Sequence, residues 1–90
     1  MSDAAPDEPV VVDARGLRCP LPVIRLAARA RELPPGTLVT VLATDPAARH
    51  DVPAWARMRG HAMAGEEHAV PDDGTPERWA LTVRLSPAPR

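Results

Sequence analysis

Residues 10–32, VVVDARGLRCPLPVIRLAARARE, predict a strand, a loop and a helix in that order. The three β-branched valines favour an extended segment that ends at Asp13. Gly16 marks a loop that runs up to Cys19. From Pro20 to Glu32 the apolar residues follow a helical period. The face expected to pack on the core carries Val23, Leu26, Ala27 and Ala30.

The middle of the chain predicts a second strand and a second helix. Pro34-Pro35-Gly36 ends the first helix, and Thr37–Thr44 is almost wholly apolar or β-branched, as in a central strand. Two helix-start signals follow, Asp45-Pro46 and Asp51 with Pro53 two residues on. We expect the helix to run from about 52 to Arg59 and to end at Gly60.

The last third predicts two strands joined by a turn at residues 71–74. Apolar residues alternate through Trp79–Leu85, whereas Gly65 and two glutamates interrupt His61–Ala69. The order β-α-β-α-β-β predicts an α/β (α+β) two-layer sandwich, a mixed four-stranded sheet with both helices on one face. We expect one domain over residues 9–86, a disordered tail over 1–8 and a C-terminal tail over 87–90.

Length and composition exclude several classes of protein. The chain has 90 residues, 44% of them hydrophobic, which suits one small domain. A single cysteine excludes an internal disulfide. No apolar stretch approaches the ~20 residues of a membrane span, and the acidic N-terminus is unlike a signal peptide. We therefore expect a cytoplasmic protein without membrane contact.

Basic residues are concentrated in the segment 14–32. This segment contains a single acidic residue, Glu32, and five arginines: Arg15, Arg18, Arg25, Arg29 and Arg31. A basic face on a chain of formal charge −1 suggests an acidic partner or an anionic ligand. A solvated helix face explains the same pattern. Direct nucleic-acid binding is not expected, because there is no overall basic excess and no aromatic platform for stacking.

Cys19 is the candidate reactive group. If Pro20 is the first helical residue, Cys19 is the N-cap, and the helix dipole with Arg18 and Arg15 favours the thiolate. Pro20 and Pro22 lack a backbone N–H, so in the first turn of the helix only Leu21 and Val23 can donate to the sulfur. Pro22 also disfavours a helical Leu21, so Leu21 is an alternative cap. A small, buried, structural cysteine is the competing interpretation.

The remaining polar candidates, the aspartates and histidines, are explained first by structural roles. Asp45 and Asp51 are expected as helix caps, and Asp45 follows a strand end where it can lie near Cys19. Asp13 is either a neighbour of Cys19 or a loop anchor. His50, His61 and His68 have no ligand spacing, so no metal site is expected. If His61 and His68 share a strand, they point to opposite faces.

Taken in order, these motifs resemble the TusA/SirA-like sulfur-carrier family over residues 10–85. The segments that carry the resemblance are Asp13-x-x-Gly16-Leu17-x-Cys19-Pro20-x-Pro22, Pro35-Gly36, Thr44-Asp45-Pro46, Asp51-Val52-Pro53-x-Trp55 and Gly60-His61. The Cys-Pro-x-Pro element alone is a weak signal. Its combination with the two downstream Asp-Pro elements is specific. The fold that the resemblance implies agrees with the order predicted above.

The resemblance implies that Cys19 accepts a sulfane sulfur as a transient persulfide, with no resident cofactor. The donor would be a cysteine desulfurase or a rhodanese, and an acceptor protein would take the sulfur onward for tRNA thiolation, cofactor biosynthesis or sulfur metabolism. Pro20, Pro22, Arg18, Gly16, Asp13 and Asp45 would support the site, and Arg18, Arg25 and Arg29 would recruit partners. We expect a monomer when free, and whether one transfer counts as catalysis is left open.

The sequence departs from part of the family at one position. Some relatives carry a second cysteine just after the aromatic position of the second helix, where this chain has Ala56. A dithiol mechanism within one chain is thereby excluded, so a thiol-redox enzyme is the weakest hypothesis. The main alternative to a sulfur carrier is a non-catalytic regulatory or interaction module that uses its arginine-rich face, with Cys19 structural.

Overall fold

A computed structural model of the chain describes residues 9–86. The elements follow in the predicted order: β1 (Val10–Ala14), α1 (Leu21–Ala30), β2 (Leu38–Ala43), α2 (Ala48–Arg59), β3 (Ala62–Ala69) and β4 (Arg78–Arg84). The two predicted tails, residues 1–8 and 87–90, lie outside the described residues.

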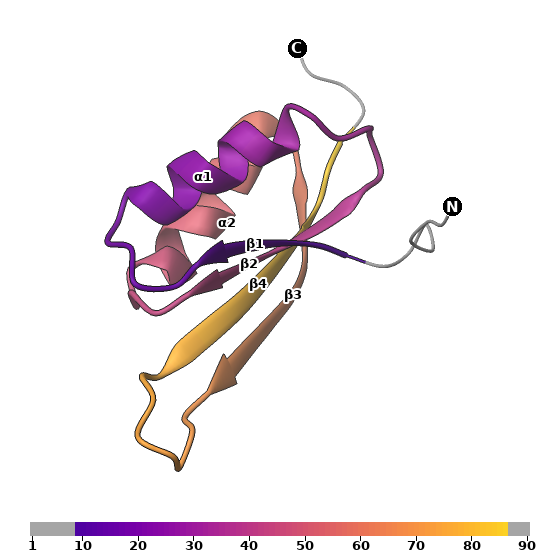
Figure 1. Cartoon of the computed structure of the whole chain (residues 1–90). Coiled ribbons are helices and arrows are strands. Elements are labelled where there is room, and N and C mark those ends of the chain that lie inside the picture. The colour runs from indigo at the N-terminus through magenta and orange to yellow at the C-terminus, as the bar shows by residue number, and fades with distance from the viewer. Residues whose placement is uncertain (1–8, 87–90) are drawn as a thin grey trace.

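The strands form one mixed sheet in the order β1-β2-β4-β3. β1 runs parallel to β2, with Val12 opposite Val41. β4 is antiparallel to both of its neighbours. Both helices cover the same face of this sheet (Figure 1). The predicted two-layer fold is therefore confirmed.

The core lies between the helices and the covered face of the sheet. Alternate residues of the two central strands point inward, as period 2 requires; they are Val39, Val41 and Ala43 from β2 and Trp79, Leu81 and Val83 from β4. Leu26 of α1 and Val52 and Ala56 of α2 close over them. The alternation predicted for the last strand thus places its apolar residues in the core.

In the part of the chain that the structure describes, no helix covers the opposite face of the sheet. Thr40 and Thr82 face each other there across β2 and β4, with their Oγ1 atoms 2.6 Å apart. The β3–β4 hairpin extends beyond the helices at its turn end (Figure 1), and seven of the eight β3 residues are exposed. Glutamates on this edge strand, Glu66 and Glu67, oppose strand addition by another chain.

The helix bounds differ from those predicted. α1 ends at Ala30, and Arg31–Leu33 continue as a looser turn, because the residue before each proline of Pro34-Pro35 avoids the helical region. α2 begins at Ala48, four residues before the predicted start. Its N-cap is Ala47, with no side-chain cap hydrogen bond, so the prediction of Asp45 as a cap is wrong. The Asp45 carboxylate instead accepts the N–H of Ala47 at 3.0 Å in the turn before the helix.

Among residues 9–86, no helix is long and apolar enough to cross a membrane.

Candidate functional site

Cys19 lies in the loop between β1 and α1, and this loop is fixed at its start. The N–H of Leu17 donates to the carbonyl of Ala14 at 3.2 Å. Gly16 adopts φ +85°, a left-handed conformation that favours glycine. The Gly16 N–H donates to Oγ1 of Thr44 at 2.9 Å. The loop is therefore joined to the β2–α2 connection, which brings Cys19 to the start of α2.

The N-cap of α1 is Pro20, so both predictions of the cap, Cys19 and Leu21, are wrong. The N–H of Leu21 donates to the carbonyl of Arg18 at 2.8 Å and is not available to the sulfur. Pro22, which is buried, occupies the first turn and fixes the entry of the helix. The helix dipole therefore contributes less to the thiol environment than the sequence suggested.

Asp45 joins the Cys19 loop to the start of α2. One carboxylate oxygen accepts the backbone N–H of Cys19 at 2.8 Å, and the other accepts that of Ala47 at 3.0 Å. These two hydrogen bonds, with a smaller contribution from the charge of Arg18, lower the pKa of Asp45. The predicted proximity of Asp45 to Cys19 is confirmed. Its carboxylate holds the backbone of the cysteine rather than its sulfur.

Asp51 is the group that touches the sulfur. The Cys19 thiol donates a hydrogen bond to a carboxylate oxygen of Asp51, with Sγ and Oδ2 2.7 Å apart. Asp51 was predicted only as a helix cap; it lies instead in the first turn of α2, because that helix begins at Ala48. The motif Asp51-Val52-Pro53 was the available signal, but nothing in it indicated a contact 32 residues away.

The environment of Cys19 favours the protonated thiol, and the prediction of a low-pKa thiolate is wrong. Burial, followed by the hydrogen bond and charge of Asp51 and the charge of Asp45, raises the pKa of Cys19 to about 12. A negative charge on sulfur is costly beside two carboxylates. The cysteine is nevertheless only partly buried, so a partner can reach it.

Asp13 acts as a loop anchor, one of its two predicted roles. Its carboxylate accepts from the guanidinium of Arg15 at 2.8 and 2.9 Å, and from the Arg15 backbone N–H at 3.1 Å. These contacts hold the pKa of Asp13 well below its usual range. Arg15 is thereby engaged in an exposed ion pair, which leaves Arg18 as the arginine that acts on the Cys19 site, through Asp45.

The three arginines predicted to recruit partners have different surroundings. Arg18 is exposed beside Cys19. Arg25 reaches the backbone carbonyl of Asp13 at 3.5 Å. Arg29 forms an ion pair with Glu32 at 2.8 Å, one helical turn on. Of the three, Arg18 is the one next to the cysteine in sequence.

His61 lies just before β3 and His68 lies within it, so the prediction that the two share a strand is wrong. His61 precedes β3, and its Nδ1 accepts the backbone N–H of Ser86 at 2.9 Å. His68 stacks on Trp79 with ring centroids 4.8 Å apart and pairs with Glu77 at 2.6 Å. Over residues 9–86, no group of three or more His, Cys, Asp or Glu side chains is placed to hold a metal ion.

Comparison with known proteins connects this geometry to one family. A family model described as "Sulfurtransferase TusA" matches residues 10–84. A protein named "Sulfur carrier protein TusA" from Pseudomonas putida (strain GB-1) is 40% identical over 79 residues, covering 88% of this chain and 92% of its own length. A protein of the same name from Pseudomonas aeruginosa (strain UCBPP-PA14) is 42% identical over 57 residues, covering 63% and 72%.

Proposed function

Since the chain belongs to the TusA sulfurtransferase family, we propose that it is a sulfur carrier that accepts a sulfane sulfur on Cys19 as a persulfide. The observation that carries this proposal is the setting of its lone thiol. Cys19 is partly exposed, its backbone N–H is bound by Asp45 and its sulfur by Asp51. The cysteine is thus held in place through its backbone and its side chain, and its sulfur is still accessible. This arrangement suits a thiol that exchanges sulfur with a partner protein docked over it.

The proposed step exchanges one sulfur atom between two cysteines. The Cys19 sulfur attacks the outer sulfur of a persulfide on the donor protein, and a new S–S bond forms at Cys19 as the donor's S–S bond breaks. The electron pair of the broken bond leaves with the donor cysteine, which takes up a proton in net exchange for the one lost from Cys19. No external oxidant or reductant is consumed, and the persulfide is the only cofactor-like group that the step requires.

The resting state keeps the nucleophile inactive. Attack requires the thiolate, and the pKa of Cys19 is raised to about 12 by burial, Asp51 and Asp45. Docking of a donor must therefore weaken the effect of those carboxylates, for example by placing a cation near Asp51.

The surface next to Cys19 suits protein docking. Leu21 and Ile24, in the first turn of α1, are 47% and 56% exposed, and Arg18 adds a positive charge on the other side of the cysteine. Apolar contacts supply binding energy, and the charge steers the encounter. The proposed donor is a cysteine desulfurase or a rhodanese in the cytoplasm, and the carrier acts as a monomer between encounters. A sulfur-acceptor protein for tRNA thiolation, cofactor biosynthesis or sulfur metabolism then takes the sulfur.

One observation favours a second candidate function. A thiol hydrogen-bonded to a carboxylate with a raised pKa is also what a structural cysteine would show. In that case the chain is an interaction module that binds a partner without carrying sulfur.

The Cys19→Ser variant separates the two functions. A hydroxyl can keep the hydrogen bond to Asp51, so we expect little change in the urea midpoint but no sulfur acquired from a cysteine desulfurase supplied with cysteine. Cys19→Ala is the companion variant without any side-chain donor. Strong destabilisation of both variants, with partner binding retained and no sulfur acquired by the wild type, would favour the interaction module.

A further inference from the structure

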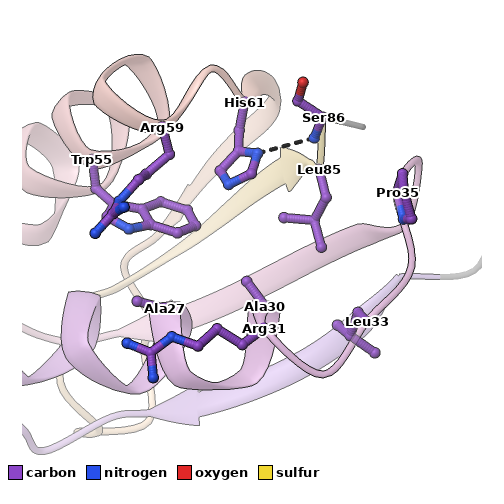
Figure 2. Close-up of a pocket in the computed structure, with 10 residues that line it drawn as sticks. All are labelled: Ala27, Ala30, Arg31, Leu33, Pro35, Trp55, Arg59, His61, Leu85 and Ser86. Atoms are coloured by element: carbon purple, nitrogen blue, oxygen red, sulfur yellow. Dashed lines mark hydrogen bonds between the residues drawn. The ribbon is translucent and has the colours of Figure 1, made fainter. Parts of the chain in front are cut away.

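A groove lies at the C-terminal ends of the two helices (Figure 2), whereas Cys19 precedes the N-terminus of α1. The groove has a volume of about 680 Å³ and opens between the last turns of α1 and α2 and the end of β4. The residues of α1 that line it, Ala27 and Ala30, lie about 9 and 14 Å along the helix axis from Leu21. A molecule bound in this groove therefore need not take part in the chemistry of the Cys19 thiol.

The floor of this groove is apolar. Ala27 and Ala30 of α1 lie opposite Leu85, which follows β4, and Trp55 of α2 forms a wall (Figure 2). Trp55 and Leu33 pack on the core from the rim and are partly exposed to the groove. A planar or aliphatic group entering here would exchange water for carbon contacts on both sides.

His61 presents a hydrogen-bond donor to the groove. Its Nδ1 accepts the N–H of Ser86 at 2.9 Å (Figure 2), so in the neutral ring the proton is on Nε2. Burial and the nearby charge of Arg59 lower the pKa of His61, which keeps the ring neutral at pH 7. Nε2 is thereby fixed as a donor, because the tautomer is set by the hydrogen bond on the other nitrogen.

Two guanidinium groups stand at the rim. Within residues 9–86, neither Arg31 nor Arg59 forms an ion pair, in contrast to Arg15, Arg29 and Arg49. Among the described residues, no aspartate or glutamate lines the groove. Two helices end here, and each C-terminus contributes roughly half a negative charge. The two positive charges of Arg31 and Arg59 exceed this total of about one negative charge, so the groove has a net positive charge.

We propose that this groove binds a small organic anion, a carboxylate or phosphate on an apolar or aromatic body. The anion would be bound by Arg31 and Arg59 with the Nε2–H of His61, and the body would lie between Trp55 and the alanines of α1. The volume falls in the range of small-ligand sites, roughly 300–1,000 Å³, which are also mostly apolar with a few convergent polar groups. This proposal is independent of sulfur transfer, because no group at Cys19 takes part.

The test uses 1-anilinonaphthalene-8-sulfonate, an aromatic anion, as the probe with the full chain at pH 7. We expect saturable binding with one site, weakened about tenfold or more in the Arg31→Gln/Arg59→Gln double variant, as the loss of charge-assisted hydrogen bonds predicts. Arg57→Gln is the matched control, since Arg57 is in the same last turn of α2 but does not line the groove. The neutral analogue N-phenyl-1-naphthylamine should bind more weakly than the anion.

A second measurement needs no variant. In ¹H–¹⁵N spectra of the wild type, the indole N–H signal of Trp55 should shift on titration with the probe, whereas that of Trp79, which is buried in the core, should not. Equal affinity of the double variant, equal loss in Arg57→Gln, or equal shifts of both indoles would overturn the proposal. None of these measurements depends on sulfur loading, so failure here is distinct from failure of the sulfur-carrier function.

Discussion

Replacing Asp51 with Asn removes the carboxylate that touches the Cys19 sulfur, and we expect the thiol to react faster with a small alkylating agent. In the wild type, burial is the largest cause of a thiol pKa of about 12, and the hydrogen bond and charge of Asp51 come next. The amide in Asp51→Asn has no charge and can donate to the thiolate. The substitution therefore lowers the thiol pKa but does not return it to the usual value, because the burial remains.

The size of the effect follows from two opposing terms. Below its pKa, a thiol gains tenfold in thiolate for each unit by which the pKa falls, but each thiolate becomes less nucleophilic, with a Brønsted coefficient of about 0.4–0.5. The net gain is about three- to fourfold per unit. Asp51 is the second-largest cause of the raised pKa, after burial, so we expect Asp51→Asn to be alkylated at least about three- to fourfold faster than the wild type at pH 8.

The assay is the rate of iodoacetamide labelling, followed by intact mass from pH 7 to 11. Asp72→Asn is the matched control, because Asp72 is exposed in the β3–β4 turn and its substitution changes the net charge by the same amount. We expect its profile to overlie that of the wild type. The reasoning is refuted if Asp51→Asn reacts no faster than the wild type, or if the wild-type profile already levels off near pH 9.

Three further changes test the fold and the resting site. Gly16→Ala forces a Cβ into φ +85°, with open space around it, so about 1–2 kcal/mol of stability should be lost to backbone strain alone; an unchanged urea midpoint would contradict this. Leu26→Ala removes a fully buried side chain and should cost about 2–5 kcal/mol, measured by urea unfolding against the exposed Ile24→Ala. Because the pKa of Cys19 is raised to about 12 in the folded protein, the thiol contributes to the free energy of unfolding below about pH 9, and this contribution should be lost as the pH rises towards 12. In Cys19→Ala, the urea midpoint should not show this decrease at alkaline pH.

Much of the fold was predictable because it depends on local periodicity. The alternation in Trp79–Leu85 and the helical spacing through Leu26 each indicate one buried face, and both faces meet in the core. The proximity of Asp45 to Cys19 could also be predicted, because Asp45 follows a strand parallel to β1 and such strand ends share one edge of the sheet.

The chemistry of the thiol could not be predicted in the same way. It depends on contacts between elements, above all that of Asp51 with the Cys19 sulfur, and on where the second helix begins. The predicted thiolate rested on a helix N-terminus, but the Arg18 carbonyl accepts the Leu21 N–H, and Asp51 at the sulfur and Asp45 at the backbone both raise the thiol pKa. Local sequence therefore predicts the position of the cysteine in the fold, but it does not predict the charge state of its thiol.

The central claim, that Cys19 carries sulfur, is tested most directly by intact-protein mass spectrometry. The full chain is incubated with a cysteine desulfurase, its cofactor and free cysteine without reductant, with Cys19→Ala in parallel. The account predicts that the wild type alone gains the mass of one sulfur atom and that dithiothreitol removes it. A wild type that gains no sulfur from either a desulfurase or a rhodanese, although iodoacetamide labels its Cys19, would contradict the account.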